Sequence, residues 1–564
     1  MIVESPNKTK KLEAILGDGY KVLSTSGHLE ELPTGRIGVD VIGGFRMLFV
    51  FKEGKQGHID QIRRSAIGAD EIYVATDPDR EGEAIAYSVT KILPLGIIPK
   101  RVTFDAITVD AVQRAFRRPR SIDQNLVKAA HSRMACDRLI GFVLSAKATD
   151  ALNEGIKRTD PGYKNFSVGR VQSPALGMVT GRTRQRRNFM PEEFFELAVN
   201  YDVFGSVGAA SFMLKGKTAA HYNTKQAANA KMGGVSKQGK HVIKSVSRNR
   251  VKVSGGRPFV TASAQQAAYG KHGIGAGGSM KAMQYLFEKG ITTYPRTDSP
   301  AVSEEALAMA RQYIEQQHGP KYFVERDFTP ADMFAQEAHE CLRPVGQIVK
   351  PHWIKDEWDS GKIFNLIKQQ FIASLMADAV IEEINYEIDA GEATFFAKGS
   401  RMVFDGFFRE TGIPEMREIP DIPEGQELRR FDVDITKVRT SPPEMHNDAT
   451  VIGSMVEHGI GRPSTYSRII ENLKERGYVG ALSGVEAVDK KAPLGFESTT
   501  EGDMLVDYLD QSFPWLMDKA FTRDLEKMLD DVARGRIKPE KPVEIVFKKL
   551  KETVPELSSF GPGL

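Results

Sequence analysis

The chain has 564 residues, of which 41% are hydrophobic and 27% charged, and it carries a formal net charge of +3 at pH 7. A chain of this length exceeds what one hydrophobic core can fill, so we expect three to five globular domains. Its two cysteines, Cys136 and Cys341, lie far apart and exclude a disulfide framework and a zinc ribbon, and no apolar run is long enough for a membrane span, so we expect neither a secreted nor a membrane-spanning protein.

The first 120 residues alternate short apolar strands with segments of helical periodicity. The strands are predicted at "MIVES", "YKVLSTSG" and "EIYVATD", and the helices at "HIDQIRRSA" and "EGEAIAYSVTKIL". This alternation is typical of an α/β domain with a largely parallel sheet, which we place at residues 1–120. Within it, residues 33–60 could instead pack with the helical domain that follows.

Acidic side chains follow the third predicted strand at every second position. Asp77 and Asp79 lie at the C-terminal edge of an apolar strand, and Glu81 follows at the same spacing where a helix begins. Side chains two positions apart in an extended chain point the same way, so these carboxylates would repel one another unless a cation neutralised them. Oxygen-only ligands favour Mg²⁺, and the pattern predicts a Mg²⁺ site. The residues alone also allow a simple turn followed by a solvated helix start.

Positive charge is concentrated in the next segment. Residues 101–190 contain 17 Lys and Arg against 7 Asp and Glu. Such a segment could face a polyanion, or it could be an ordinary solvated basic surface. From residue 121 to residue 187 its periodicity is helical.

Two later stretches alternate apolar and polar residues with period two. They lie within residues 188–254 and 381–440, and they suggest one antiparallel domain through which the chain passes twice. The residues between them, 255–380, have helical periodicity and are predicted to form an inserted domain. Its glycine-rich segment "HGIGAGGSM" is interpreted as a flexible connection between helices. Residues 441–564 return to a helical pattern.

The order of the acidic residues resembles the Toprim domain of topoisomerases, bacterial primases and some nucleases. In that family one strand ends in Glu and another in Asp-x-Asp, and here "MIVESPNKTKK" places Glu4 at a strand end and Lys8 one turn later. The resemblance implies Mg²⁺-assisted phosphoryl chemistry. It makes Glu4, Asp77, Asp79 and Glu81 the metal-binding residues, and it gives Glu4 and Lys8 catalytic roles.

A second motif, "GITTYPRTDSP", closely resembles the active-site signature of type IA DNA topoisomerases. In that family the tyrosine, here Tyr294, attacks a DNA phosphodiester and becomes joined to the 5′ phosphate. A phenol has a pKa of about 10 and leaves more readily than a sugar hydroxyl, so the linkage can be reversed without ATP. Arg296 would present a fork of donors to the phosphate oxygens. Without the family, Tyr294 would be a tyrosine in a loop.

Further motifs follow in the order that this family has. They include "STSGHLEELP", "RMACDRLIGF", "SVGRVQSPAL", "HECLRP" and "GIGRPSTYSRIIENLKERGYV". By resemblance, His339 is a catalytic residue near Tyr294, and Asp448 stands where the family often has Glu. The residues that the resemblance assigns to DNA binding are His28, Arg133, Asp137, Arg170, Gln172, Ser173, Glu340, Arg343, Arg462, Ser464, Thr465 and Arg476.

The resemblance implies a multidomain α/β plus α+β architecture, the toroidal core of a type IA topoisomerase. Its expected parts are a Toprim domain at 1–120, a helical DNA-groove domain at 121–187 and 441–564, a β-rich arch at 188–254 and 381–440, and a helical domain at 255–380 that carries Tyr294.

The expected activity is ATP-independent relaxation of negatively supercoiled DNA, with Mg²⁺ as cofactor and a single-stranded DNA segment as partner. The protein is expected to be a monomer, cytoplasmic and associated with the nucleoid, with no membrane partner. Two other classes stay open. A Toprim nuclease or primase would explain the acidic residues but give Tyr294 no role, and a catalytically inactive scaffold would bind single-stranded DNA without forming a covalent adduct.

Overall fold

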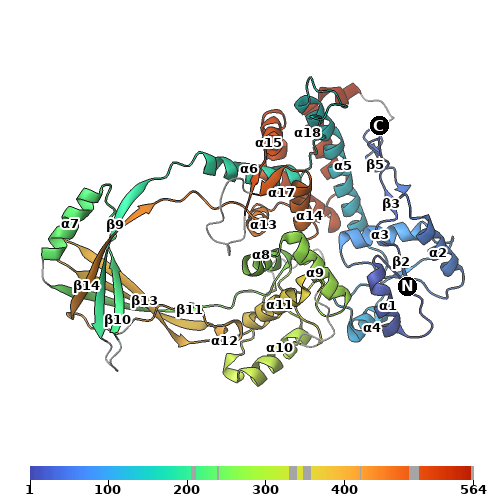
Figure 1. Ribbon diagram of the computed structural model, residues 1–564. Helices are drawn as coiled ribbons and strands as arrows, with labels where there is room; N and C mark the ends of the chain where they lie inside the picture. Colours follow the sequence, from blue (N-terminus) through green and yellow to red (C-terminus); the bar gives the residue numbers. More distant parts are fainter. Residues whose placement is uncertain are drawn as a thin grey trace.

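The computed structural model describes residues 1–204, 211–237, 240–329, 339–346, 348, 357–419, 421–481 and 495–559. Their helices and strands form four units arranged in a ring (Figure 1). The units are an α/β unit (residues 2–117), a groove unit (124–187 and 448–559), a barrel (193–253 and 379–439) and an inserted helical unit (261–374).

The α/β unit is a parallel sheet with helices on both faces. Its strands are β1 (Ile2–Val3), β2 (Leu23–Ser24), β7 (Tyr73–Val74) and β8 (Lys100–Arg101), in the order β2-β1-β7-β8. Its helices are η1 (Pro6–Lys8), α1 (Thr9–Leu16), α2 (Gln56–Ile67), α3 (Arg80–Thr90) and α4 (Val109–Arg117). Neighbouring residues of a strand point to opposite faces, so Ile2 packs with α2 and α3 while Val3 packs with α1 and α4.

Helix α3 ends earlier than the sequence pattern predicts. The apolar periodicity extends to Leu93, but the helix stops at Thr90 with Lys91 as its C-cap. Pro94 follows, and a proline disfavours helical backbone in the residue before it.

Two small hairpins lie between β2 and α2. They pair β3 (Glu30–Glu31) with β6 (Val50–Phe51) and β4 (Val39–Asp40) with β5 (Arg46–Met47). Ile37 and Val39 belong to the hydrophobic cluster of the groove unit, whereas Ile59 belongs to that of the α/β unit. The hairpin residues therefore pack with the groove unit, and α2 returns the chain to the sheet.

The barrel is closed by six antiparallel strands from both β-rich stretches. Its elements are β9 (Glu193–Phe204), β10 (Ser211–Lys217), α7 (Lys225–Lys237), β11 (His241–Val253), β12 (Ala379–Asp389), β13 (Thr394–Phe404) and β14 (Glu427–Arg439). The strand order is β10-β13-β12-β11-β14-β9. Alternate residues such as Leu197, Val199 and Tyr201 fill its core, as the period-two pattern predicts.

Two long strand pairs leave the barrel in different directions (Figure 1). β9 and β14 pair as far as Glu193 and Arg439, beside the groove unit, and β11 and β12 pair as far as Val253 and Ala379, beside the inserted helical unit. In the described part of these strands, β11 and β14 pair with each other at His241 and Val242 alone. The barrel therefore joins the two helical units through separate two-stranded arms, and this makes the ring.

The inserted helical unit comprises α8 (Thr261–His272), α9 (Ala276–Glu288), α10 (Glu304–Gln317), η2 (Pro320–Tyr322), η3 (Glu357–Asp359) and α11 (Ser360–Ser374), against which α12 (Phe408–Thr411) packs. The interpretation of the glycine-rich segment as a flexible connection is wrong for most of its residues. Gly275 is the N-cap of α9, and Gly277 and Gly278 lie inside that helix.

The groove unit is built on the 29-residue helix α5 (Gln124–Leu152). Around it lie α6 (Gln172–Arg187), α13 (Asp448–Glu457), α14 (Tyr466–Glu475), α15 (Thr500–Ser512), α16 (Pro514–Met517), α17 (Lys519–Ala533), α18 (Glu540–Thr553) and η4 (Pro555–Ser559). The helical pattern did not predict its hairpin of β15 (Val479–Ala481) and β16 (Phe496–Ser498). No helix in the described part of the chain is long and apolar enough to cross a lipid bilayer.

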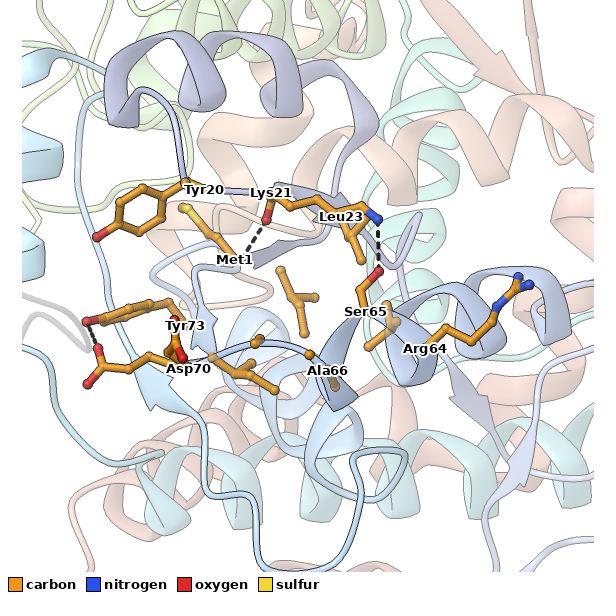
Figure 2. A pocket seen from close by; sticks show the side chains of 16 residues that line it. Met1, Tyr20, Lys21, Leu23, Arg64, Ser65, Ala66, Asp70 and Tyr73 are labelled. Atoms are coloured by element: carbon orange, nitrogen blue, oxygen red, sulfur yellow. Dashed lines mark hydrogen bonds between the residues drawn. The ribbon is translucent and has the colours of Figure 1, made fainter.

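A hollow of about 720 Å³ opens at the amino ends of the sheet strands (Figure 2). Met1, Tyr20, Lys21, Ser65 and Tyr73 line it, and Lys21 donates to the Ser65 hydroxyl at 3.1 Å. Glu4 and Asp77 lie at the opposite, carboxyl ends of the strands. The hollow is therefore separate from the acidic residues that the sequence singles out.

Candidate active site

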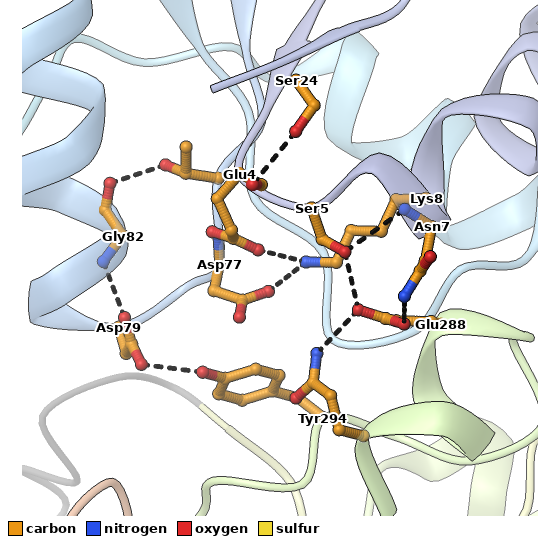
Figure 3. A network of polar contacts seen from close by, with 12 residues as sticks. Glu4, Ser5, Asn7, Lys8, Ser24, Asp77, Asp79, Gly82, Glu288 and Tyr294 are labelled. Atoms are coloured by element: carbon orange, nitrogen blue, oxygen red, sulfur yellow. Dashed lines mark hydrogen bonds and ion pairs between the residues drawn. The ribbon is translucent and has the colours of Figure 1, made fainter. Parts of the chain in front are cut away.

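The carboxyl ends of β1 and β7 bring Glu4 and Asp77 together (Figure 3). The backbone N–H of Asp77 donates to Glu4 Oε2, and Lys8 Nζ donates to Glu4 Oε1 and to Asp77 Oδ1. Lys8 is enclosed, with 1% of its side chain exposed. The ammonium therefore bridges the two acidic side chains.

Burial and the contacts with Lys8 shift the pKa values of Glu4 and Asp77 in opposite directions. Burial and the neighbouring Asp77 carboxylate raise the pKa of Glu4 to about 8. Burial also opposes ionisation of Asp77, but the Lys8 ammonium outweighs it and lowers the pKa of Asp77 to about 2. Burial lowers the pKa of Lys8, and the two carboxylates more than reverse that effect. At neutral pH Lys8 and Asp77 are charged, and Glu4 keeps its proton.

Asp79 begins helix α3. Its Oδ1 accepts from the N–H of Gly82 at 2.7 Å, which caps the helix. A Cβ at Gly82 would lie 2.0 Å from the carbonyl oxygen of Asp77, so only glycine lets the helix approach the strand end this closely. The motif therefore contains both the turn and the helix start of the simpler interpretation, and it still leaves Asp79 Oδ2 directed out of the helix.

The loop that carries Asp77 is also held by the side chain of Arg101. The buried Arg101 donates to the carbonyl oxygens of Thr76 and Asp77, each at 2.8 Å, and to Glu83 Oε2 at 2.9 Å. Arg101 was not among the predicted site residues, because nothing in its sequence context distinguishes it from a surface arginine.

Tyr294 reaches this carboxylate edge from the inserted helical unit. It follows α9 in a segment that pairs with "CLRP", where Thr293 donates to the carbonyl oxygen of Arg343 at 3.0 Å. Its hydroxyl donates to Asp79 Oδ2 at 2.7 Å (Figure 3). Arg296 Nη1 lies 3.1 Å from the same hydroxyl and 3.3 Å from Asp77 Oδ2. The motifs at residues 77–79 and 294–296 thus meet in one site.

Tyr294 is enclosed, with 1% of its surface exposed. Its ring and that of Phe287 belong to the hydrophobic cluster of the α/β unit. Burial, together with the charges of Asp77 and Asp79, raises the pKa of Tyr294 well above its ordinary value, so the phenol is protonated at neutral pH. A proton acceptor is therefore needed to make it a nucleophile, and Asp79 is already hydrogen-bonded to it.

Polar contacts surround this aromatic interface between the α/β unit and the inserted helical unit. Glu288 accepts from Ser5 Oγ and from Asn7 Nδ2, each at 2.9 Å, and Arg114 pairs with Glu305 at 3.2 Å.

His339 lies beside Tyr294, with ring centroids 5.3 Å apart. Its Nδ1 is 2.7 Å from Asp105 Oδ1, and the N–H of Tyr294 donates to the carbonyl oxygen of Asp105 at 2.8 Å. Asp105 was missed from sequence. It follows β8 at the edge where Glu4 and Asp77 follow β1 and β7, and the rule that sites gather at the carboxyl ends of parallel strands could have found it.

Glu81 turns away from the other carboxylates. Its two oxygens lie 3.5 Å from His28 Nε2 and 3.6 Å from Arg133 Nη1. Burial would raise the pKa of Glu81, but the hydrogen bond with His28 and the charge of Arg133 lower it to about 2.

A small hollow beside Glu81 leads towards Tyr294. The α/β unit, the groove unit and the inserted helical unit all contribute to its lining. The lining residues are Asp79, Arg80, Glu81, Arg133, Arg296, Asp298, Arg462, Pro463 and Ser464. Of the predicted DNA-binding residues, Arg133, Arg462 and Ser464 are therefore next to the site. Thr465 caps the turn after Arg462, and Arg476 ends α14.

Several residues predicted to bind DNA are buried in this closed arrangement. Arg170 is 1% exposed and is held between Asp137 Oδ1 at 2.8 Å and Glu526 Oε1 at 2.7 Å. Burial opposes ionisation of Glu526, and Arg170 lowers its pKa to about 2. The other buried members of the set are Gln172, Ser173 and Arg343. Each of these three side chains has a hydrogen-bond partner within the protein.

Asp448 joins the groove unit to the inserted helical unit. Its Oδ2 accepts from the N–H of Ala276 at 2.7 Å, at the first turn of α9, and its Oδ1 pairs with Lys474. A carboxylate at a helix N-terminus is stabilised by the helix dipole. The shorter aspartate therefore makes a firm contact where the family often has glutamate.

The acidic residues are compatible with Mg²⁺, although they do not form a complete cage. Among the described residues, no three His, Cys, Asp or Glu side chains are grouped so that they could hold one metal ion. Mg²⁺ commonly takes one or two carboxylates and completes its shell with water and substrate phosphate. Asp77 and Asp79, which both lie within reach of Arg296 and Tyr294, fit that requirement.

Comparisons with known proteins give matches over almost the whole chain. Residues 1–107 match the family model described as the Toprim domain, and residues 121–544 match the one described as DNA topoisomerase. DNA topoisomerase 1 of Pseudomonas aeruginosa is 34% identical over 95% of the chain, and that of Aquifex aeolicus is 33% identical over 95% of both proteins. The chain spans 64% of the length of the Pseudomonas protein. A structure of full-length topoisomerase I from Thermotoga maritima matches 98% of the chain and 89% of its own, with a TM-score of 0.83 and 27% identity.

Proposed function

The chain belongs to the type IA DNA topoisomerase family, and we propose that it relaxes negatively supercoiled DNA without ATP by cutting and resealing one strand through Tyr294. The observation that carries the proposal is the meeting of two distant motifs. The Tyr294 hydroxyl is hydrogen-bonded to Asp79, next to the Glu4, Lys8 and Asp77 cluster.

Cleavage needs one proton removed and one supplied. The Tyr294 oxygen attacks the phosphorus, its proton passes to Asp79, and the bond from phosphorus to the 3′ oxygen breaks. Glu4, which keeps its proton at neutral pH, donates it to that leaving oxygen. Resealing is the reverse, with the 3′ hydroxyl attacking the phosphotyrosine and Tyr294 leaving.

Two cations face the phosphate during these steps. Lys8 is held by Glu4 and Asp77, and Arg296 contacts the phenol oxygen, so both stabilise charge that grows on the phosphoryl oxygens. His339, beside the Tyr294 ring, is the third group proposed to act there. When bound at Asp77 and Asp79, Mg²⁺ would supply further positive charge for resealing.

Strand passage requires the α/β unit and the inserted helical unit to separate. Tyr294 is enclosed at their interface, whose other contacts are largely hydrogen bonds and ion pairs that water can replace. Exposing the Tyr294 and Phe287 rings costs about 1.5–3 kcal/mol each, an amount that DNA contacts can offset. The barrel arms keep the two halves connected while the ring opens between them.

We further propose that the substrate is a single-stranded segment of negatively supercoiled DNA, whose phosphates would meet Arg133, Arg296 and Arg462 beside the site. The protein would act as a monomer, in the cytoplasm and at the nucleoid.

The test is relaxation of negatively supercoiled plasmid with Mg²⁺ and without ATP. Wild-type protein should relax the plasmid, and Tyr294→Phe should not, while its affinity for single-stranded DNA stays within about threefold because backbone contacts dominate binding. Relaxation by Tyr294→Phe at the wild-type rate would reject the proposal. Irreversible nicking or nucleotide incorporation would favour a Toprim nuclease or primase, and tight binding without any adduct would favour a scaffold.

A further inference from the structure

Asp105 contacts the inserted helical unit at two points. It lies four residues beyond the end of β8, in the α/β unit, and its side chain is 36% exposed. Its carboxylate meets His339 Nδ1 at 2.7 Å, and its own carbonyl oxygen accepts the N–H of Tyr294 at 2.8 Å. One residue therefore holds both the nucleophile's backbone and the neighbouring imidazole.

The side-chain contact has a defined direction. An ionised carboxylate can only accept a hydrogen bond, so Nδ1 of His339 must carry the hydrogen. This bond fixes the tautomer of His339 and the plane of its ring, as carboxylate partners of functional histidines commonly do. The ring plane matters here, because the imidazole packs at 5.3 Å against the ring of Tyr294.

We propose that Asp105 is a positioning residue for DNA cleavage, which orients His339 beside the scissile phosphate when the α/β unit and the inserted helical unit are closed. The inference rests on the proposed function. Asp105 acts through His339 and does not itself touch the reacting atoms. Because the two residues belong to units that separate during strand passage, His339 is held in its working orientation only in the closed state.

A simpler interpretation is that the Asp105 side chain only shapes the loop whose carbonyl oxygen accepts from the N–H of Tyr294, and so stabilises closure independently of His339. In that case the loss of Asp105 would weaken the closed state for every step, and it would do so whether or not His339 were present. The two interpretations are separated by a double-mutant cycle, since residues that act through one another have non-additive effects.

The experiment compares wild type, Asp105→Ala, Asp105→Asn, His339→Ala and the double variant Asp105→Ala/His339→Ala. For each, the affinity for a single-stranded oligonucleotide is measured separately from the single-turnover rate of covalent adduct formation. Asp110→Asn is the matched control, because Asp110 is an exposed carboxylate at the start of the next helix. Thermal denaturation of each variant reports whether it is folded.

Asp105→Ala should slow cleavage between about tenfold and a hundredfold, the effect of a misplaced catalytic group, while affinity stays within about threefold. Asp105→Asn should recover part of the rate, since its amide oxygen can still accept from Nδ1. The double variant should be no slower than His339→Ala alone, and Asp110→Asn should match wild type.

Equal losses from Asp105→Ala in the presence and absence of His339 would overturn the proposal, as would an unchanged rate or a loss confined to affinity. If the wild-type chain itself forms no adduct, the proposed function fails and the role of Asp105 fails with it. Additive losses in an active protein overturn the role of Asp105 alone.

Discussion

The hydroxyl of Tyr294 donates a hydrogen bond to Asp79 at 2.7 Å, although 215 positions separate the two residues. The contact joins the α/β unit to the inserted helical unit and covers the nucleophile. The closed ring is therefore a state in which the reacting groups are assembled, and opening the interface is a step of its own.

Fixing this interface should stop relaxation. Arg114 on α4 and Glu305 on α10 form an ion pair across it, and both side chains are 61% exposed. Replacing both with cysteine and joining them with a reducible thiol cross-linker should lower relaxation to background, because the units can no longer part. Reduction of the linker should restore the wild-type rate.

The single variants Arg114→Cys and Glu305→Cys, treated with the same reagent, are the controls for the cross-link. The native Cys136 and Cys341 are buried and should not react. Undiminished relaxation by the cross-linked protein would show that strand passage does not use this interface.

Removing the acidic pair should abolish the Mg²⁺-dependent part of the reaction. We expect Asp77→Ala/Asp79→Ala to lower relaxation by on the order of a hundredfold or more, the usual worth of a catalytic metal ion or oxyanion contact. Plasmid relaxation across a Mg²⁺ titration measures this effect.

Asp70→Ala, at the opposite edge of the same sheet, is the control for the acidic pair and should behave as wild type. If the double variant kept the wild-type Mg²⁺ dependence, Asp77 and Asp79 would not be the metal site.

The protonation of Glu4 should appear in stability without any metal or DNA. Its pKa rises from 4.5 to about 8 on folding, so the folded state keeps a proton that the unfolded state releases over this range. The free energy of unfolding therefore loses a contribution from Glu4 as pH rises from about 4.5 to 8. Glu4→Gln removes this loss, and its melting temperature relative to wild type should increase across that range.

Cleavage should depend on the same proton. With Mg²⁺ chelated, the rate of adduct formation by wild type should fall as pH rises through about 8, because Glu4 then cannot protonate the leaving 3′ oxygen. Glu4→Gln should form the adduct slowly at every pH.

The stability measurement tests the raised pKa of Glu4 separately. A melting-temperature difference between Glu4→Gln and wild type that stays constant from pH 5 to pH 8 would contradict it.

The buried pair of Arg170 and Glu526 should stabilise the groove unit. Both side chains are enclosed, and Glu526→Gln leaves the Arg170 charge with Asp137 alone, which should cost about 3–5 kcal/mol at pH 7. The pKa of Glu526 is lowered on folding to about 2, so its contribution is present above the unfolded value of 4.5 and is lost as pH falls towards 2.

Thermal denaturation at pH 7 and at lower pH measures the Glu526→Gln effect. The difference from wild type should shrink below pH 4.5. Asp507→Asn removes an exposed pair with Arg184 and should leave the melting temperature unchanged. An effect of Glu526→Gln no larger than that of Asp507→Asn would mean that the pair does not stabilise the fold.

The sequence predicted the parts of this site that local chemistry encodes. Asp77 and Asp79 follow a short apolar run, so the acidic strand end was predicted from pattern alone, whereas Glu4 was added through the Toprim resemblance. The period-two stretches likewise predicted the antiparallel strands that the structure pairs. The meeting of Tyr294 with Asp79 came only from the family resemblance, because no local pattern relates segments so far apart.

Features that depend on the tertiary fold were not predictable. Arg170 has the sequence context of an exposed groove residue. In the structure it is buried and donates a hydrogen bond to Glu526, which lies hundreds of positions away in the sequence. Closure of the barrel depends on contacts of β10 with β13, for which the described residues give a single pair, Lys217 with Phe396. Asp105 escaped notice because three residues separate it from the end of its strand.

The most direct test of the account is to identify the atom that holds cleaved DNA. Wild-type protein is incubated with a single-stranded oligonucleotide, denatured to trap the adduct, and digested with trypsin and nuclease before mass spectrometry. The account predicts a phosphorylated peptide of residues 290–296, in which Tyr294 carries the phosphate from the 5′ end of the cleaved strand. An adduct on another residue, attachment through a 3′ phosphate, or no adduct from a protein that relaxes plasmid would contradict it.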